Sequence, residues 1–192
     1  ITAVAEAVHS VGGLFVLDCI ASGTIWVDME ACAVDILISA PQKGWSSSPC
    51  SGLVMLSALA RERIEATTST SFACDLLKWL QIMEAYENGG HAYHATMPTD
   101  SLKEFRDVMK ETEDYGFDKL RAKQQELGNK VRALLVSKGL QSVAAEGFQA
   151  PGVVVSYTDD IDIHKGTKFL QVGLQIAAGV PLRCDEPEGF QT

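Results

Sequence analysis

The chain has 192 residues, of which 46% are hydrophobic, and it carries a formal net charge of −9. This length suffices for one domain with a sizeable core, or for one domain and part of another. An acidic protein repels nucleic acid and anionic membrane surfaces, so neither is an expected partner. No apolar run is long enough to span a membrane, and no signal-peptide pattern is present.

The cysteines are scattered and odd in number, and no two of them form a CxxC pair. This usage favours reduced thiols in a cytoplasmic setting and disfavours a cysteine-rich metal site. The five cysteines are Cys19, Cys32, Cys50, Cys74 and Cys184.

The two ends of the chain predict a piece of a longer protein. Ile1 is not an initiator methionine, and the chain begins inside a helical pattern. It stops after residues 189–192 without a polar tail.

The first part of the chain predicts an α/β layer. Residues 3–11 have helical spacing and are followed by Gly12 and Gly13, which favour a helix end. Buried strands are expected over residues 14–17, 34–38 and 51–57. The loop of residues 40–50 is short for a helical crossover, so the third strand should run antiparallel to the second. The result is a mixed sheet with helices packed on it.

The second part of the chain is predicted to be mainly helical. The expected elements are a helix over residues 71–88, an N-cap at Thr99 and Asp100 for a helix from Ser101, a strand over residues 153–155 and a helix over residues 166–178. A long helix should end at Lys138 and Gly139, and its apolar residues fall on one face. These residues are Leu120, Leu127, Val131, Leu134 and Leu135. A domain boundary is expected near residues 110–120.

Two residues at predicted strand ends are candidates for chemistry. Lys43 follows the second strand in a loop of Gly, Ser and Pro, where α/β sheets place their ligands, and a lysine held in a pocket can act as a nucleophile. Asp18 ends the first strand, so its carboxylate should lie at the same sheet edge and needs a cationic partner if buried. On spacing alone, a solvated surface lysine is the better interpretation of Lys43, and an ordinary cap is an equal alternative for Asp18.

Two other polar clusters are weaker candidates for a catalytic or metal site. Ser46, Ser47 and Ser48 lack the second glycine of a nucleophile elbow, so a polar turn is the better interpretation. His91 and His94 are three residues apart, but no third ligand stands at a suitable spacing for a metal.

Three stretches, taken in order, resemble class V aminotransferases of the alanine–glyoxylate and serine–pyruvate type. The stretches are residues 17–24 (LDCIASGT), 34–44 (VDILISAPQKG) and 91–98 (HAYHATMP). The resemblance implies fold type I of the pyridoxal-phosphate (PLP) enzymes, an α/β fold with a mixed, mostly parallel sheet and helices on both faces. It implies that residues 1–115 are the C-terminal part of the large PLP-binding domain. Residues 116–192 would be an incomplete, smaller α+β domain entered through a long helix.

The resemblance also implies a cofactor and the residues that hold it. Lys43 would bind PLP as a Schiff base and later move a proton between the substrate Cα and the cofactor C4′. Asp18 would pair with the pyridinium nitrogen, Ile20 would pack on one face of the ring, and Gln42 would help to hold the phosphate or the cofactor's edge. Trp45 could line the pocket, although core packing is the simpler interpretation.

The implied assembly is a homodimer with shared active sites. Tyr93 and Thr96 match family positions that reach across the dimer to the partner's PLP phosphate. The implied reaction moves an amino group from a small amino acid, alanine or serine, to a small 2-oxo acid, glyoxylate or pyruvate, by a ping-pong mechanism.

The chain also departs from the family pattern. A phosphate loop and a ring-stacking aromatic residue would precede Ile1, and the substrate-carboxylate arginine would follow Thr192. Arg183 does not match that arginine's motif. We therefore expect this piece alone to be inactive.

Two alternatives stay open. One is another fold-type-I enzyme such as a lyase or a cysteine desulfurase, although Gln42 stands where desulfurases usually have histidine and Cys184 is the only late cysteine. The other is a non-catalytic, dimerising relative, which the presence of both Asp18 and Lys43 disfavours.

Overall fold

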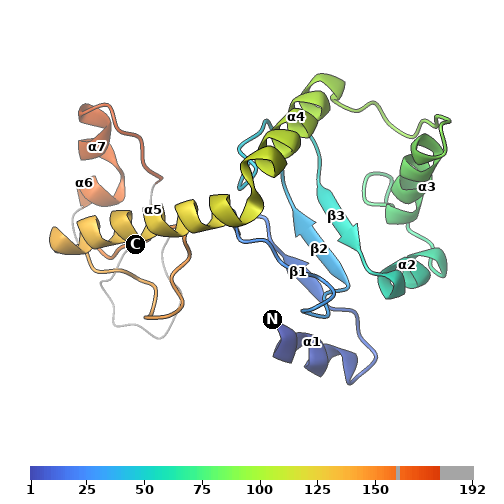
Figure 1. Ribbon diagram of the computed structural model, residues 1–192, viewed down its shortest axis with the longest axis horizontal. Coiled ribbons are helices and arrows are strands. Elements are labelled where there is room, and N and C mark those ends of the chain that lie inside the picture. The colour runs from blue at the N-terminus through green and yellow to red at the C-terminus, as the bar shows by residue number, and fades with distance from the viewer. Residues whose placement is uncertain (159–160, 178–192) are drawn as a thin grey trace. The chain divides into compact units, whose positions relative to one another are not determined.

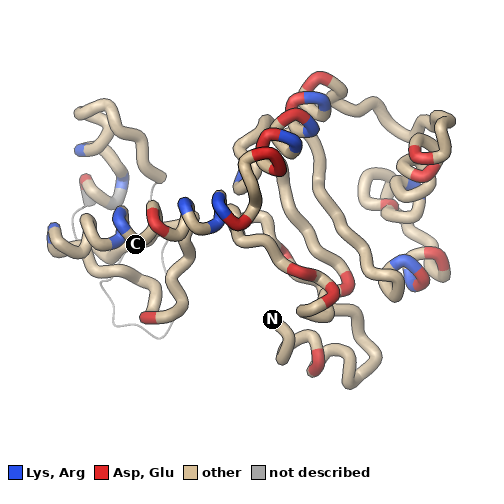
Figure 2. The backbone as a smooth tube through the Cα atoms, in the orientation of Figure 1, with Lys and Arg blue, Asp and Glu red and all other residues tan. Residues whose placement is uncertain are grey.

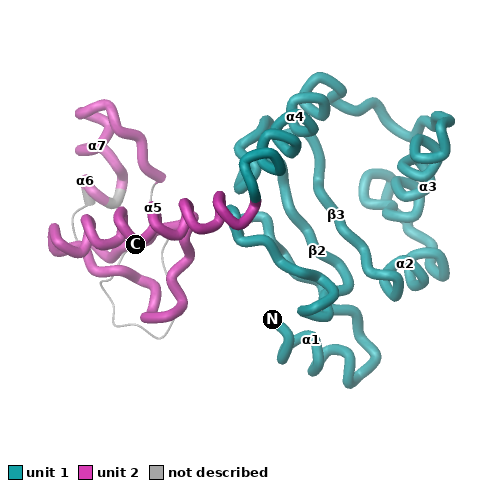
Figure 3. The backbone as a smooth tube through the Cα atoms, viewed as in Figure 1, with its two compact units in different colours: residues 1–116 teal, residues 117–192 magenta. Residues whose placement is uncertain are grey.

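The computed structural model describes residues 1–158 and 161–177. The chain divides into two compact units, Ile1–Gly116 and Phe117–Thr192 (Figure 3). The first unit holds the sheet, and the second is built on one long helix. No helix among the described residues is both long and apolar enough to cross a membrane.

The sheet of the first unit has three strands in the order β1-β2-β3 (Figure 1). The strands are β1 (Val16–Asp18), β2 (Ile36–Ser39) and β3 (Leu53–Leu56). β1 and β2 are parallel, with Asp18 opposite Ile38, whereas β2 and β3 are antiparallel, with Ser39 opposite Leu53. The mixed sheet and the antiparallel third strand, both predicted from the sequence, are confirmed.

A small apolar core lies beside the sheet. Cys19, Val34 and Leu37 form its buried centre. The partly buried residues packed on this centre are Phe15, Leu17, Val27, Met29 and Cys32. The core thus combines one residue of β1, Leu17, and one of β2, Leu37, with residues that flank the two strands.

Helices α1 (Thr2–His9), α2 (Ala58–Glu65), α3 (Leu76–Glu87) and α4 (Thr99–Tyr115) complete the first unit. Ser57 caps α2 by accepting a hydrogen bond from the Ala60 amide, and Asp75 caps α3 by accepting one from the Lys78 amide. Acidic and basic positions are interspersed along α4 (Figure 2), so its polar side suits solvent.

Several predicted helix boundaries in the first unit are wrong. The helix predicted from residue 71 begins at Leu76, because Asp75 caps it and Ser71 accepts a hydrogen bond from the Cys74 amide in the preceding turn. The predicted N-cap of α4 is also wrong: Pro98 occupies that position, and Thr99 lies inside the helix. The short helix α2 was not predicted.

Asp35 ties three elements together. Its Oδ2 accepts hydrogen bonds from His9 Nε2 and the Phe15 amide, both at 2.7 Å, and its Oδ1 accepts one from Ser57 Oγ at 3.1 Å. Asp35 is buried, with 4% of its surface exposed. Burial alone would raise the pKa of this carboxyl, but the bonds from His9, Phe15 and Ser57 offset burial and hold the pKa below its ordinary value.

The second unit is organised by α5 (Phe117–Ser137), followed by α6 (Ile161–His164) and α7 (Thr167–Gln171). One face of α5 holds a distant loop: Gln124 Nε2 donates to Pro151 O at 2.9 Å, and Arg132 Nη2 donates to Ala150 O at 2.8 Å. A Cβ on Gly128 would lie 2.4 Å from Pro151 O, so the close approach requires glycine here.

The second unit departs from the sequence predictions in two places. Residues 153–155 form no strand, and an isolated bridge between Ser142 and Ser156 stands beside them. The helix predicted over residues 166–178 is limited to α7 within the described residues, because Gly173 adopts a positive φ of 80°. The long helix does end before Lys138 and Gly139, as predicted. Leu127, Val131 and Leu134 on its predicted apolar face are exposed.

Candidate functional site

Asp18 and the loop that carries Lys43 follow two adjacent parallel strands. Asp18 is the last residue of β1, and Ser39 is the last residue of β2. The Cys19 amide donates to Ile38 O at 2.7 Å, which keeps the two chains together past the end of β1. Both candidates therefore leave the same carboxyl edge of the sheet, where open α/β sheets bind ligands.

The Asp18 carboxylate is exposed and accepts a hydrogen bond from the Ile20 amide at 2.9 Å. This bond uses Oδ1 in a local turn and leaves Oδ2 with acceptor capacity. Ile20 itself is half-buried.

Cys19, beside Asp18, is a poor nucleophile. Burial raises the pKa of its thiol, a side-chain hydrogen bond with Ser22 offsets part of that rise, and the negative charge of Asp18 adds to it. The thiol therefore stays protonated near neutral pH, and we assign it to packing.

The Lys43 loop is closed by its own backbone. The Ser47 amide donates to Pro41 O, and the Ser46 amide donates to Lys43 O, each at 3.0 Å. Pro41 is fully buried, whereas Gln42 and Lys43 are exposed. The loop is thus anchored in the protein at Pro41, whereas the Gln42 amide and the Lys43 amine are exposed to solvent.

Two glycines bring the loop after β1 against the lysine loop. A Cβ on Gly44 would lie 2.0 Å from Gly23 O, a distance that no side chain tolerates. Thr24 and Ser47, which lie just beyond these glycines in the sequence, have buried hydroxyl groups without a hydrogen-bond partner. Such buried polar groups favour a polar ligand or water nearby.

Aromatic rings and α4 hold the other side of the lysine loop. The Trp45 ring lies 5.0 Å from the Trp26 ring and 5.7 Å from the Phe105 ring, centroid to centroid. Ser48 Oγ donates to Glu104 Oε2 at 2.9 Å. The structure supports core packing for Trp45, and these contacts were not predicted because no sequence spacing links Trp26 or Phe105 to the loop.

Tyr93 and Thr96 form a pair between α3 and α4. Their hydroxyl oxygens are 3.0 Å apart, and both residues are exposed. His94 anchors the segment, because its ring lies 4.3 Å from the Phe72 ring and 5.0 Å from the Trp79 ring and its Nε2 is 2.9 Å from Phe72 O. Within the described part of the chain, no hydrogen bond joins this pair to Asp18, Gln42 or Lys43.

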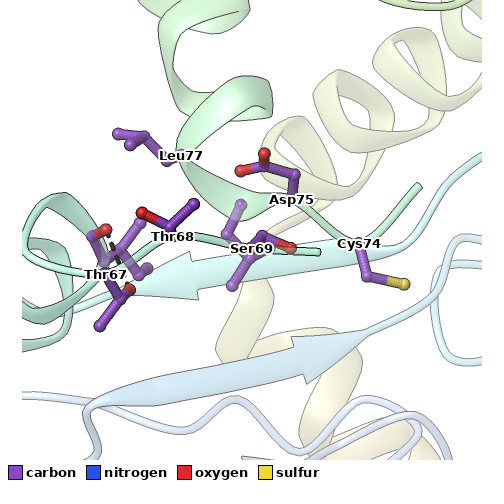
Figure 4. Close-up of a pocket in the computed structure, with 8 residues that line it drawn as sticks. Thr67, Thr68, Ser69, Cys74, Asp75 and Leu77 are labelled. Atoms are coloured by element: carbon purple, nitrogen blue, oxygen red, sulfur yellow. Dashed lines mark hydrogen bonds between the residues drawn. The ribbon is translucent and has the colours of Figure 1, made fainter. Parts of the chain in front are cut away.

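A shallow pocket of about 170 Å³ lies between α2 and the start of α3 (Figure 4). Its lining consists of Ile64, Thr67, Thr68, Ser69, Cys74, Asp75, Leu76 and Leu77. None of the residues predicted as a site lines this pocket. Asp75 is the one ionic side chain of this lining, and its Oδ1 caps α3.

Other sequence candidates gain no support as a catalytic or metal site. Among residues 1–158 and 161–177, no group of three histidine, cysteine or acidic residues could hold a metal ion. Ser48 is bonded to Glu104 and has no histidine partner of the kind a hydrolase requires. Arg183, Cys184 and residues 189–192 lie outside the described residues.

The architecture matches that of several solved aminotransferases. An alanine–glyoxylate aminotransferase from Nostoc sp. superposes with a TM-score of 0.82 at 18% identity, over 98% of this chain and 49% of that one. A ureidoglycine–glyoxylate aminotransferase from Bacillus subtilis gives a TM-score of 0.74 at 20% identity, over 92% and 46%. An aspartate aminotransferase from Thermus thermophilus gives 0.75 at 23%, over 92% and 49%.

This is the fold of the fold-type-I, PLP-dependent aminotransferases. No family model matches the sequence. The chain spans about half the length of the solved structures it matches. Identities at this level show the fold and leave the activity to be argued from the site.

Proposed function

We propose that this chain is part of a PLP-dependent class V aminotransferase that moves an amino group from a small amino acid to a small 2-oxo acid. The observation that carries the proposal is the placement of Asp18 and Lys43 at the carboxyl edge of adjacent parallel strands. The likeness to an alanine–glyoxylate and a ureidoglycine–glyoxylate aminotransferase supports alanine as donor and glyoxylate as acceptor. Serine and pyruvate are included because the sequence also resembles the serine–pyruvate type.

The residues present fit this cofactor. A protonated pyridine nitrogen needs an anion, and the Asp18 carboxylate is accessible and keeps acceptor capacity. The cofactor's carbonyl carbon needs an amine, and Lys43 is exposed on a loop whose backbone is fixed. The buried hydroxyl groups of Thr24 and Ser47, which lack partners, fit a polar ligand or its bound water on the inner side of these loops.

Bound PLP supplies an electron sink for the negative charge that develops at the substrate Cα. The residues of the chain bind the cofactor, orient it and move protons. Lys43 Nζ would hold the cofactor until the amine of the substrate displaces it, and the freed amine would then take the proton from Cα and give one to C4′. Asp18 would keep the ring nitrogen protonated, Ile20 would limit water on one ring face, and Gln42 would hydrogen-bond to the cofactor's edge.

The proposal extends to a homodimer. Tyr93 and Thr96 are exposed and joined to each other, which leaves them available to hold the phosphate of a partner's cofactor. In this scheme the first unit is the C-terminal part of the large PLP-binding domain. The second unit is part of the small domain.

Half-reaction spectroscopy on the intact protein tests the reaction type. We expect alanine or serine to shift the visible absorption of the PLP-loaded protein, and glyoxylate or pyruvate to reverse the shift. Replacement of the base by Lys43→Ala should slow the shift about 10²- to 10⁴-fold. Release of sulfide from cysteine, or irreversible cleavage of the donor, would show a desulfurase or a lyase instead.

A further inference from the structure

We propose that α4 positions the cofactor lysine, with Glu104 and Phe105 as the residues that do so. The inference rests on the proposed function of Lys43, and it assigns a role to residues outside the sequence-predicted site. Glu104 and Phe105 are assigned as positioning residues, with no role in contacting the cofactor or the reacting atoms. They act through Ser48 and Trp45 on the loop that carries the lysine.

Two backbone hydrogen bonds tie the residues around Lys43 to one another. Pro41, two residues before the lysine, is fully buried, and its carbonyl accepts the Ser47 amide at 3.0 Å. The Lys43 carbonyl accepts the Ser46 amide at 3.0 Å, with Ser46 at a positive φ of 58°. A shift of Trp45 or Ser48 is therefore transmitted to the lysine backbone.

Trp45 provides the apolar attachment of this loop. Its ring packs against Phe105 of α4 edge to face, with an interplanar angle of 81°, and against Trp26 at 49°. Phe105 is buried, with 6% of its surface exposed, although its neighbours on α4 are mostly exposed. Edge-to-face ring pairs at these distances are attractive and directional, so they define where the loop sits.

Ser48 provides the polar attachment. Its hydroxyl donates to Glu104 Oε2 at 2.9 Å, one residue before Phe105 on the same helix. The two attachments hold loop positions three residues apart to adjacent helix positions, so the loop is held at two points.

The same helix begins beside the other candidate segment. α4 starts at Thr99, three residues after Thr96. α4 therefore follows the segment of the proposed phosphate-binding pair, Tyr93 and Thr96, and carries the two residues that contact the lysine loop. Preorganisation of this kind matters because a lysine base works only within a narrow range of distance and angle.

The first test measures the loop without cofactor. Amide hydrogen exchange in the intact protein should be about three- to tenfold faster at Ser46 and Ser47 in Glu104→Ala, the change expected for loss of one hydrogen bond. Glu104→Gln keeps an acceptor oxygen and should restore wild-type exchange. Glu111→Ala, at an exposed position of the same helix, and the Cys19 amide, bonded to Ile38 O in the sheet, serve as unchanged controls.

The second test measures the lysine with PLP bound. The pH titration of the visible absorption of the lysine-bound cofactor should be displaced in Glu104→Ala and in Phe105→Leu, and should be restored in Glu104→Gln. Suppose that the wild type shows this absorption, but Glu104→Ala and Phe105→Leu change neither its pH titration nor the exchange rates of the Ser46 and Ser47 amides. That result would overturn the inference and leave the proposed function standing. A wild type that shows no such absorption would overturn the proposed function.

Discussion

At the scale of single residues, Asp35 and Gly44 show how side chains outside the chemistry hold the candidate site. Asp35 joins α1, the residues before β1 and the cap of α2 through three hydrogen bonds. Gly44 lets the lysine loop lie directly on the loop after β1. Each leads to a prediction about stability.

The low pKa of Asp35 makes the first unit sensitive to acid. A carboxyl whose pKa is lowered by folding stabilises the fold above its unfolded pKa, and this contribution disappears as the pH falls through the folded pKa. The loss should therefore begin below about pH 3.8, the ordinary value. Asp35→Asn should lower the free energy of unfolding by about 2–4 kcal/mol at neutral pH and flatten its acid dependence.

Urea unfolding at a series of pH values measures both effects. Asp114→Asn, an exposed carboxylate on α4, is the matched control and should leave the profile unchanged. An Asp35→Asn protein with the wild-type stability and acid profile would show that the network contributes nothing to folding.

Gly44 should tolerate no side chain. Gly44→Ala places a Cβ where Gly23 O stands, so the two loops must separate, at a cost of about 1–3 kcal/mol in the free energy of unfolding. Gly52→Ala is the control, because a Cβ there meets no atom within 4 Å. Equal midpoints of urea unfolding for the two variants would contradict the close contact.

At the residue scale, the sequence predicted the position of a side chain correctly where that side chain lies at the end of a recognisable strand. Asp18 and the Lys43 loop were expected at the same sheet edge because buried apolar runs precede both, and the register of β1 and β2 agrees. Glu104, Phe105 and His9 were not predicted. Their partners are distant in sequence, and no local pattern distinguishes them from other helical residues.

At the scale of elements, the segment between α3 and α4 depends on His94. Its ring lies between Phe72 and Trp79, and Trp79 Nε1 donates to Ala73 O at 2.8 Å. His94→Ala should lower the free energy of unfolding by about 1–2 kcal/mol through the loss of these contacts. His91→Ala, at an exposed histidine of the same segment, should change it by less than about 0.5 kcal/mol.

Thermal and urea unfolding of both histidine variants decide this point. If His91→Ala costs as much stability as His94→Ala, the aromatic contacts of His94 do not anchor the segment.

Element prediction was best where one local signal dominates. Apolar runs predicted all three strands, and the short loop predicted the antiparallel pair. The predicted burial is wrong for β1 and β3, where Val16, Val54 and Met55 are exposed. Caps and turns were less predictable, because Asp75 and Pro98 compete with neighbouring residues that are also good helix starters. Val153, Val154 and Val155 have strong β-propensity, but pairing beside them is limited to the isolated bridge between Ser142 and Ser156, so no strand is assigned to them.

At the scale of the whole molecule, the fold follows from three observations that agree. The mixed sheet, the candidate residues at its carboxyl edge and the match to solved aminotransferases all fit fold type I. The choice of donor and acceptor does not follow from the fold. A TM-score reports the backbone path, which different substrates share.

Borohydride reduction followed by peptide mapping tests the central claim, that Lys43 binds PLP, most directly. The intact protein would be loaded with PLP, reduced and digested, and its peptides examined by mass spectrometry, with Lys43→Ala and Asp18→Asn treated in parallel. We predict a pyridoxyl adduct on Lys43 in the wild type, its absence in Lys43→Ala and a reduced yield in Asp18→Asn. An adduct on another lysine, or none in folded and PLP-supplemented wild-type protein, would contradict the claim.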